Sequence, residues 1–481
     1  MFNQFLKRKK KPQDTIASYY NREDTNQVSV SNEPLPNNNT DILVLNNEHQ
    51  INKKRILFSL IPVLFLILVL GFILVSVLNK PKIVPIPIAP QPITLRIWEY
   101  TENSDHFQKL INDYHSKNPL INVVFEQRDP ITYKTDLEQR LKSNSINLPD
   151  ILELDSKNIN LYKSYLSSAP TSVYTSEEYN QLYYSHMVRD NVFSQSIYGV
   201  PTGNDGLILA YNTDLVKTET PTYWLEFINL VNSLTTPDTK NYGTNKINGI
   251  AASSSKSMNY LPEILQLLIF QNKQNDFYDL DGNIHLPFTN TSDAINLYQR
   301  LIAKTPWDSK ATSSLQAFTA GNTAFAFIKA KDIYTIQSKN SKLNFKTTLI
   351  PIISDQKYWS SYTSLSVSNI SSNTKEAWKL IKYLSSEDSV KYLYQSAADF
   401  NLSKKPYAFK SLSQDLKSDN LYTPIGVMAP NMITWNSPDY DQTNKIFLNL
   451  IQQNSNNILS KDNIDLLNTN LNNVLINPSF Q

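Results

Sequence analysis

The chain contains no cysteine and very little glycine. Its 481 residues include 9 Gly and 5 His, and 45 Lys and Arg stand against 43 Asp and Glu, for a formal net charge of +2. The missing cysteine excludes disulfides, thiolate metal sites, a cysteine nucleophile and a lipid-modified cysteine. Scarce glycine argues against a glycine-rich phosphate-binding loop. The near-neutral charge argues against a nucleic-acid-binding protein.

One long apolar run stands near the N-terminus. Residues 56–78 carry no charged side chain, and at ~1.5 Å per residue a helix of this length covers the ~30 Å hydrocarbon core of a bilayer. Basic residues gather before the run, in 7–11 and 53–55, and only Lys80 and Lys82 follow it closely. This bias predicts a single-pass membrane helix with a cytoplasmic N-terminus. The alternative, a cleaved signal peptide, has a shorter apolar stretch close to the chain start.

The segments on either side of the apolar run are predicted to lack a core of their own. Residues 1–55 are polar and rich in asparagine, as expected for a disordered cytoplasmic tail. Residues 79–92 form a proline-rich linker, with five prolines in 81–92, which favours an extended chain. The rest of the chain, 93–481, is then expected outside the cell membrane.

The remaining segment begins with alternating strand and helix patterns. Residues 93–100 and 121–127 alternate apolar side chains, and DILELD at 150–155, after Pro149, indicates a third strand. Helical spacing lies between these strands, in the segment that ends at Asn118-Pro119 and in the next segment with Tyr133, Leu137 and Leu141. The βαβαβ order predicts an α/β fold around a largely parallel sheet.

Eight segments in order resemble the family 1 extracellular solute-binding proteins of ABC importers, the maltose-binding-protein-like group. The segments are ITLRIWEY, the helix before INVVFEQ, LPDILELD, YGVPTGNDGLILAYNTDLV, TPTYWLEFINLVNSL, FTAGNTAFAF, KEAWKLIKYLSSEDSVKYL and MITWNSPDYDQTNKIF. The chain departs from the family pattern in three respects. It has no lipobox cysteine, Ala330-Lys331 replaces a common Pro-Trp pair, and Ser360 and Ser361 replace glycines. The identity of the solute therefore does not follow from the resemblance.

The resemblance implies a two-lobed, type II periplasmic-binding-protein-like module, in which hinge closure encloses a solute. Lobe 1 is expected at about 93–203 and 352–400, and lobe 2 at about 208–348 and 401–481. Crossings between the lobes are expected near Gly203 to Leu207 and near Thr348 to Ile352, because glycine or proline interrupts an extended run at each place.

Polar side chains that follow the predicted strands are the first candidates for solute contact. Ligands of open α/β sheets meet the loops at the carboxyl ends of strands, and the family motifs select the same positions. These candidates are Glu99 after the first strand, Asp155 after the third, and Asn204 with Asp205 at the first crossing between the lobes. Carboxylates and amides hydrogen-bond sugar hydroxyls, and aromatic rings cover the C–H faces of a sugar. The aromatic candidates are Tyr260, Trp359, Tyr362 and Trp435, with core packing or helix capping as the alternative role throughout.

The function implied by the resemblance is capture of a solute, a mono- or oligosaccharide, for delivery to ABC permease subunits. We expect a monomer that is not an enzyme, has no metal site or cofactor, binds no nucleic acid and contacts the lipid bilayer through residues 56–78. A membrane-anchored sensor or adhesion protein on the same scaffold is one alternative. An extracellular glycosidase is another, since it also combines carboxylates with aromatic rings.

Overall fold

The computed structural model describes residues 53–78, 91–143, 148–237, 245–273, 277–278, 283–303, 312–435, 437, 439–454 and 457–478. The predicted cytoplasmic tail before Lys53 and the linker residues 79–90 lie outside the described residues. The chain divides into two compact units, 1–87 and 88–481.

The first unit contains one described helix, α1 (Lys53–Leu78), with Pro62 inside it. Its side chains are described from Pro62 onward, and its large apolar side chains are exposed, from Val63 at 51% to Leu78 at 74%. Among the described residues, no helix combines the length and apolarity needed to cross a membrane.

Lobe 1 of the second unit is built on a six-stranded sheet with the order β2-β1-β3-β14-β4, and β7 pairs with β14. Strands β1, β2 and β3 are parallel, as the βαβαβ pattern predicted, and β14 runs antiparallel to β3. The strands are β1 (Ile93–Glu99), β2 (Ile121–Gln127), β3 (Ile151–Asp155), β4 (Leu166–Ser167), β7 (Val200–Pro201) and β14 (Thr363–Ser368). The helices are α2 (Ser104–Lys117), α3 (Tyr133–Lys142), α4 (Ile159–Tyr162), α5 (Ser176–Leu182), α6 (Ser185–Asn191), α12 (Thr374–Leu384) and α13 (Glu387–Ser396). Short connections are η1 (Ser156–Asn158), η2 (Lys163–Tyr165), η3 (Ala397–Phe400) and the hairpin of β5 (Val192–Phe193) and β6 (Ser196–Ile197).

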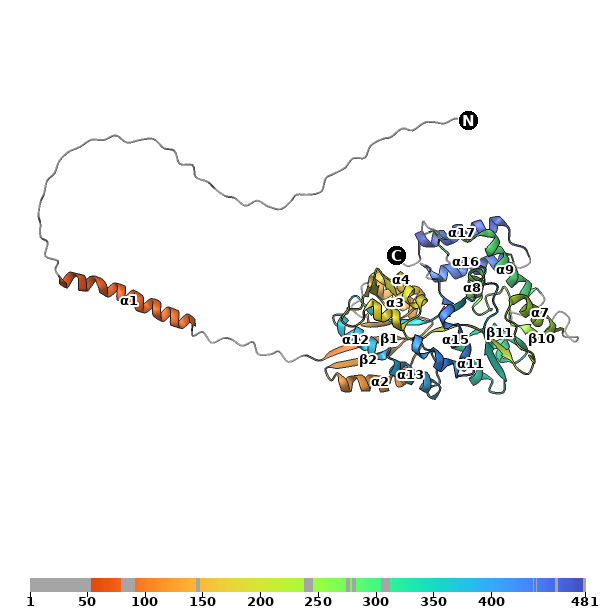
Figure 1. Cartoon of the computed structure of the whole chain (residues 1–481), viewed down its shortest axis with the longest axis horizontal. Helices are drawn as coiled ribbons and strands as arrows, with labels where there is room; N and C mark the ends of the chain where they lie inside the picture. Colours follow the sequence, from red (N-terminus) through yellow and green to blue (C-terminus); the bar gives the residue numbers. More distant parts are fainter. Residues whose placement is uncertain are drawn as a thin grey trace, which may run out of the picture. The chain divides into compact units, whose positions relative to one another are not determined.

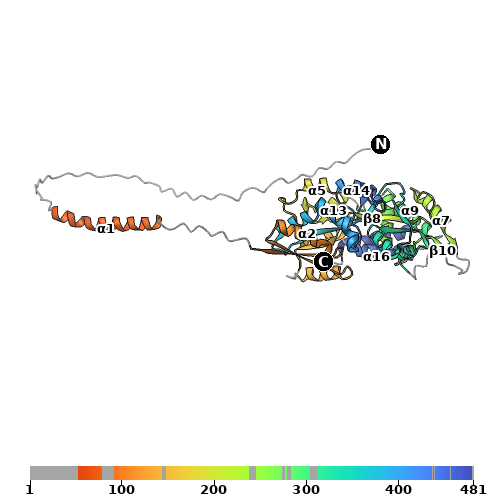
Figure 2. The ribbon, with the colours of Figure 1, turned by 90° about the horizontal axis from the view of Figure 1, so that it is seen from below.

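Lobe 2 is built on a seven-stranded sheet with the order β15-β13-β8-β11-β10-β9, and β12 also pairs with β8. The strands are β8 (Asp205–Asn212), β9 (Thr236–Pro237), β10 (Asn245–Ile250), β11 (Thr323–Lys329), β12 (Phe345–Thr348), β13 (Tyr358–Ser361) and β15 (Met432–Ile433). The helices are α7 (Trp224–Leu234), α8 (Leu261–Gln271), α9 (Phe288–Ile302), α10 (Ser314–Thr319), α11 (Asp332–Lys339), α14 (Ser413–Lys417), α15 (Thr423–Met428), α16 (Tyr440–Gln453) and α17 (Lys461–Ile476), with η4 (Lys410–Leu412) and η5 (Ala429–Asn431). Helix α7 and strand β10 lie at the end of this lobe away from β1 and α2 (Figures 1 and 2).

The chain passes between the two sheets at short connections. Residues 202–204 join β7 to β8, close to the predicted crossing at Gly203 to Leu207. The return to lobe 1 is made by Tyr362 alone, between β13 and β14. The sequence placed this return at Thr348 to Ile352, and the structure corrects it: Pro351 ends the extended run, but the chain then re-enters the lobe 2 sheet as β13.

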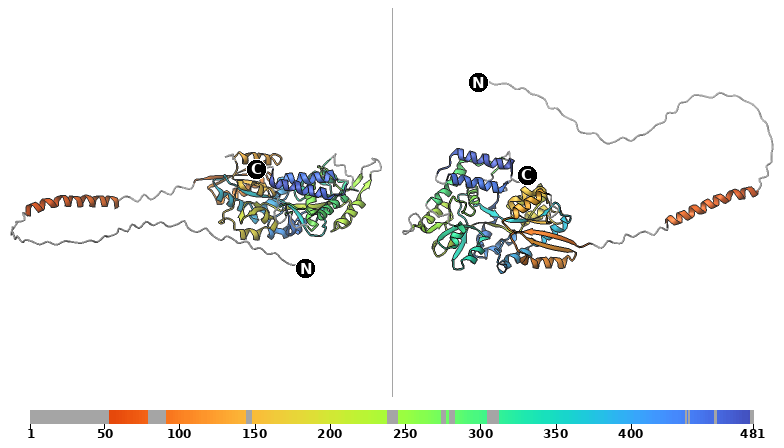
Figure 3. Two further views of the ribbon diagram at one scale, coloured as in Figure 1. Left: turned by 90° about the horizontal axis from the view of Figure 1, so that it is seen from above. Right: turned by 180° about the vertical axis from the view of Figure 1, so that it is seen from behind.

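Two asparagines of α17 complete the backbone hydrogen bonding of a neighbouring segment in lobe 2. Asn472 accepts from Ile284 N and donates to Ile284 O, at 2.8 Å each. Asn468 makes the same pair with Leu286, at 2.8 and 3.1 Å. The two side chains thus act as a strand would, because each offers one acceptor and one donor to the extended backbone. Helices α16 and α17 lie side by side (Figures 1 and 3).

Candidate functional site

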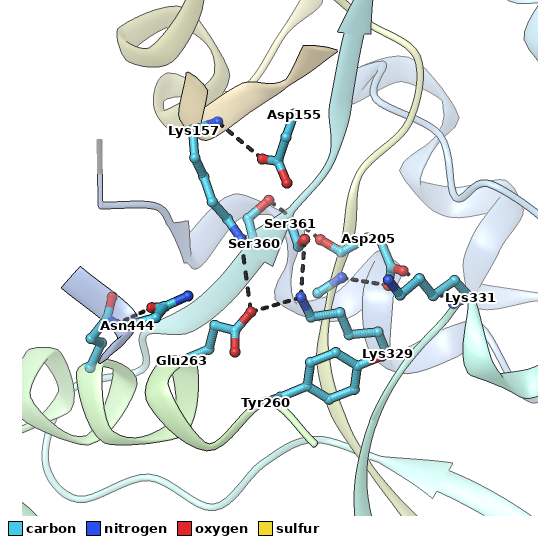
Figure 4. Close-up of polar contacts among 12 residues, drawn as sticks. Asp155, Lys157, Asp205, Tyr260, Glu263, Lys329, Lys331, Ser360, Ser361 and Asn444 are labelled. Carbon is cyan, nitrogen blue, oxygen red and sulfur yellow. Dashed lines mark hydrogen bonds and ion pairs between the residues drawn. The ribbon is translucent and has the colours of Figure 1, made fainter. Parts of the chain in front are cut away.

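The ends of three elements bring polar side chains together where the lobes meet (Figure 4). Strand β3 of lobe 1 ends at Asp155, whose carboxylate accepts a hydrogen bond of 3.1 Å from Lys157 N and caps η1. From lobe 2, β11 ends at Lys329, and α8 carries Glu263 in its first turn. We call Lys157, Glu263 and Lys329, together with Tyr260 and Tyr440, the junction site.

Glu263 is the centre of the junction site. Its Oε1 lies 3.1 Å from Lys329 Nζ and 3.8 Å from Lys157 Nζ. Figure 4 shows the two lysines approaching this carboxylate from different elements, and Lys329 also donates to Ser361 Oγ at 3.1 Å. All three charged side chains are buried, with exposed fractions of 5, 9 and 4% for Lys157, Glu263 and Lys329.

Burial and ionic contacts oppose one another in setting the charges of this site. Burial alone would raise the pKa of the Glu263 carboxyl, but the Lys329 and Lys157 ammonium groups outweigh it and lower that pKa to about 2. Burial would lower the pKa of Lys329, and Glu263 and Asp205 raise it overall. Burial lowers the pKa of Lys157 and the Lys329 ammonium adds to that effect, while the Asp155 and Glu263 carboxylates oppose the shift without cancelling it. Glu263 and Lys329 therefore form the stable pair, and Lys157 is the weakly compensated third charge.

Lysine ammonium groups cover the two aromatic rings of the junction site. Lys157 Nζ lies 3.8 Å from the centroid of the Tyr440 ring, and Lys329 Nζ lies 4.5 Å from the centroid of the Tyr260 ring. Tyr260 is held in the left-handed region at φ 61°, and its hydroxyl donates to Asp332 at 2.8 and 3.0 Å. The site thus offers carboxylate, ammonium and ring faces, which together suit a polyhydroxylated molecule.

Asp205 and Asn204 lie beside the junction site but are committed to backbone and buried partners. Asp205 accepts hydrogen bonds from the backbone N–H groups of Gly206, Ala330 and Lys331, at 2.6, 2.7 and 3.1 Å. Burial raises its pKa, and the Lys329 ammonium partly counters this. Asn204 is fully buried and accepts from Ser360 Oγ at 3.0 Å. These two residues fix the first crossing, and any contact of theirs with solute stays a prediction.

Glu99 lies apart, inside lobe 1. It is fully buried, and neither of its carboxylate oxygens has a hydrogen-bond partner among the described residues. Burial raises its pKa, and the Glu153 carboxylate adds to this. The nearby Lys405 Nζ forms ion pairs with two other acidic residues, at 3.2 Å from Glu102 and 3.5 Å from Glu153. Contact of Glu99 with a solute stays a prediction.

The remaining aromatic candidates pack inside the protein. Trp359 and Trp435 belong to the apolar core of lobe 2, with exposed fractions of 0 and 2%. The Trp435 ring meets Phe277 edge-on at 4.5 Å, and the Tyr362 hydroxyl donates to Asp190 at 3.0 Å. The geometry therefore gives these three residues packing and hinge roles, and their contact with a solute is untested.

A sequence model described as "Bacterial extracellular solute-binding protein" matches residues 109–421. The chain belongs to this family. No curated protein sequence matches this solute-binding protein.

Solved structures share the fold of this solute-binding protein. The sugar-binding protein MalE from Xanthomonas citri is 16% identical, with a TM-score of 0.65 over 80% of this chain and 98% of that chain. The maltose-binding protein MalE from Listeria monocytogenes, in complex with maltose, is 16% identical with a TM-score of 0.64 over 80% and 98%. An ABC substrate-binding protein from Listeria monocytogenes, in complex with cycloalternan, is 15% identical with a TM-score of 0.63 over 81% and 100%. At these identities the likeness shows the two-lobed fold.

Sequence reasoning missed the charged core of the site in this solute-binding protein. Lys329 ends a strand in which every residue is buried, and Glu263 stands alone in an apolar helix. A single charge within such a stretch must find a partner on burial, which is the signal that could have identified both. Within the described residues, no group of three or more His, Asp and Glu side chains could hold a metal ion.

Proposed function

We propose that the chain is a membrane-anchored extracytoplasmic binding protein that captures a mono- or oligosaccharide between its lobes and delivers it to an ABC permease. The observation that carries the proposal is the junction site, which sits where two α/β lobes meet and combines Glu263, two lysines and two tyrosine rings. Sugar hydroxyls both donate and accept hydrogen bonds, so the carboxylate and the ammonium groups can each serve them.

The sugar class is supported by the chemistry of the junction site and by the nature of the structural neighbours. The two MalE proteins and the cycloalternan complex are sugar-binding or sugar-bound. In this chain, the tyrosine rings supply surfaces for C–H faces, and charges of both signs stand beside them to hydrogen-bond sugar hydroxyls.

The membrane anchor is supported by the sequence of 56–78 and by the exposure of α1. The run 56–78 carries no charged side chain, and the large apolar side chains of α1 from Val63 to Leu78 are exposed, as expected of a helix that lies in an apolar surrounding. We infer a cytoplasmic N-terminus from the basic residues that precede the run. Carbonate extraction of membranes should leave the chain in the pellet, and protease added to intact cells should remove the C-terminal unit and spare an N-terminal tag.

Sugar capture can be tested on the full chain in lipid nanodiscs. Isothermal titration with maltose, maltotetraose and a cyclic tetrasaccharide should detect binding of at least one sugar, and Glu263→Gln should weaken that binding. Binding of amino acids or phosphate with no response to any sugar would contradict the solute class. Uptake of the bound sugar should be lost when the gene is deleted, whereas unchanged uptake with binding intact would favour a sensor. Turnover of a bound glycoside would instead indicate an enzyme.

A further inference from the structure

We propose that Lys157 is an internal occupant of the solute site: without solute it holds the lobes together by filling the Tyr440–Glu263 face, and a solute binds by displacing it. The inference rests on the proposed function for the class of the displacing solute. The other part of the inference, that Lys157 holds the lobes together, rests only on the geometry of the junction site.

The contact joins opposite lobes of the molecule. Lys157 belongs to η1, directly after β3 in lobe 1, whereas Tyr440 begins α16 and Glu263 lies in α8 of lobe 2. The ammonium lies 3.8 Å from the Tyr440 ring centroid and 3.8 Å from Glu263 Oε1, with 5% of the side chain exposed. Lys157 is the only lobe 1 residue of the junction site. Opening the lobes must therefore withdraw its side chain from Tyr440 and Glu263.

The Lys157 contact can break while the ion pair inside lobe 2 stays formed. Glu263 has a closer partner in its own lobe, Lys329 at 3.1 Å, and Lys329 also donates to Ser361. When Lys157 leaves, the carboxylate stays paired. Lys157 itself returns to water and regains its hydration, and its lowered pKa in the closed form is consistent with a charge held at a cost. A permanent contact between the lobes would instead place the Lys157 ammonium at hydrogen-bond distance from a carboxylate that has no other partner.

The same geometry restricts what can take over the Tyr440 face. An anion that took the place of Lys157 would meet the Glu263 carboxylate at the centre of the site. A neutral polyol avoids this penalty, because its C–H face covers the ring while its hydroxyls accept from Lys329 and donate to Glu263. Neutral sugars, rather than uronic acids, are therefore the class that displaces the lysine.

A second ion pair between the lobes provides a matched control. Lys134 of α3 contacts Asp441 of α16, one residue after Tyr440, but these side chains are 35 and 56% exposed. An exposed pair contributes little and is screened at 1 M salt, where the Debye length is ~3 Å. The buried Lys157 contact should resist the same salt.

The absence of cysteine allows a direct measurement of lobe separation. Spin labels at Gln139→Cys on α3 and Leu466→Cys on α17, both exposed, are the only thiol-linked labels in the full chain in nanodiscs. Double electron–electron resonance then reports the distance across the junction. Without solute, Lys157→Met should raise the ratio of open to closed populations by ~2- to 30-fold, the range of a cation–π contact. Lys134→Met should change this ratio less. Lys157→Arg keeps the positive charge and should keep the ratio of the parent chain.

The outcomes separate the two proposals. An unchanged distance distribution in Lys157→Met, or equal opening in Lys157→Met and Lys134→Met, overturns the role of Lys157 whatever the chain binds. Loss of closure by the parent chain at 1 M salt does the same. Maltose is the probe for displacement: the parent must give up the Lys157 contact to bind it and Lys157→Met need not, so the variant should bind maltose more tightly than the parent, and weaker binding by the variant overturns displacement. If the unliganded comparison succeeds and no sugar alters any variant, the lysine contact stands and the sugar assignment fails.

Discussion

The hydroxyl of Tyr362 donates a hydrogen bond of 3.0 Å to Asp190 Oδ2, which ties the residue that carries the chain back to lobe 1 to the helix α6. Thr434 Oγ1, directly after β15 of lobe 2, bonds the same carboxylate at 2.7 and 2.8 Å. Asn191 Nδ2 donates to the Tyr362 hydroxyl at 3.1 Å. One fully buried carboxylate thus joins α6, a crossing between the lobes and the end of β15.

The position of Asp190 predicts a pH-dependent stability. Burial raises its pKa from 3.8 to about 6, although the Arg189 guanidinium and the Thr434 and Tyr362 hydroxyls oppose the shift. Between pH 4 and 6 the folded chain then binds more protons here than the unfolded chain, so this carboxyl lowers the free energy of unfolding as pH rises, by up to about 3 kcal/mol.

This dependence is measured by urea unfolding of the parent and Asp190→Asn chains at pH 4, 5, 6 and 7. The stability of Asp190→Asn relative to the parent should increase up to pH 6 and then level off. A difference that stays constant from pH 4 to 7 would show that Asp190 titrates normally.

Removing the charge of Glu263 should strongly destabilise the chain. Glu263→Gln leaves Lys329 and Lys157 buried without a carboxylate, and breaking a buried pair costs about 3 to 5 kcal/mol. The double variant Glu263→Gln/Lys329→Met should recover part of that loss, because it removes one of the stranded ammonium groups. Thermal and urea unfolding measure both, and a harmless Glu263→Gln would contradict the pairing.

The stability from Glu263 also has a pH signature. Because its pKa is about 2 in the folded chain, below the usual 4.5, its contribution is present above pH 4.5 and is lost as pH falls toward 2. Unfolding curves of Glu263→Gln and the parent should converge in that acidic range.

Gly206 allows two strands of lobe 2 to approach closely. A Cβ at this position would lie 2.5 Å from Trp359 O and 2.6 Å from Met428 Cε. Gly206→Ala should therefore cost about 1 to 3 kcal/mol, the usual range for overpacking a core. Gly71→Ala is the control, since apart from the neighbouring residues and backbone of its own helix no heavy atom would lie within 4 Å of a Cβ there. Equal stability of the two variants would exclude the close approach.

The asparagine pairs of α17 should be sensitive to substitution. Asn472→Ala removes both partners of the Ile284 backbone groups, which costs about 1 to 3 kcal/mol if those groups stay unpaired. Asn473→Ala, on the exposed side of the same helix, should stay within about 0.5 kcal/mol of the parent. Urea unfolding compares them, and amide hydrogen exchange at Ile284 should accelerate in Asn472→Ala alone.

Local patterns predicted the framework of lobe 1 well. The alternation in 121–127 matches β2, and Asn118 ends α2 where the Asn-Pro pair predicted. The return crossing was misplaced because Pro351 interrupts a strand without ending its sheet. Nothing local in the sequence shows that β13 pairs with β8 before the chain leaves lobe 2.

The candidate site was predictable only in part, for a similar reason. The rule of strand ends placed Asp155 near the junction, and the predicted first crossing placed Asp205 there. Whether a tryptophan faces a ligand or a core depends on partners from distant segments, and Trp435 finds Phe277 and Phe447. The Lys157–Glu263 contact likewise joins residues that no short motif connects.

Because Tyr362 alone joins β13 of lobe 2 to β14 of lobe 1, related chains should tolerate no insertion or deletion at this connection. Residues of β13 and β14 on either side belong to different sheets with fixed registers, so one inserted or deleted residue would turn every side chain of one strand to its opposite face. Loops elsewhere on the surface tolerate such changes. Across related chains, the spacing between Ser361 and Thr363 should therefore stay constant even where the sequence around it diverges.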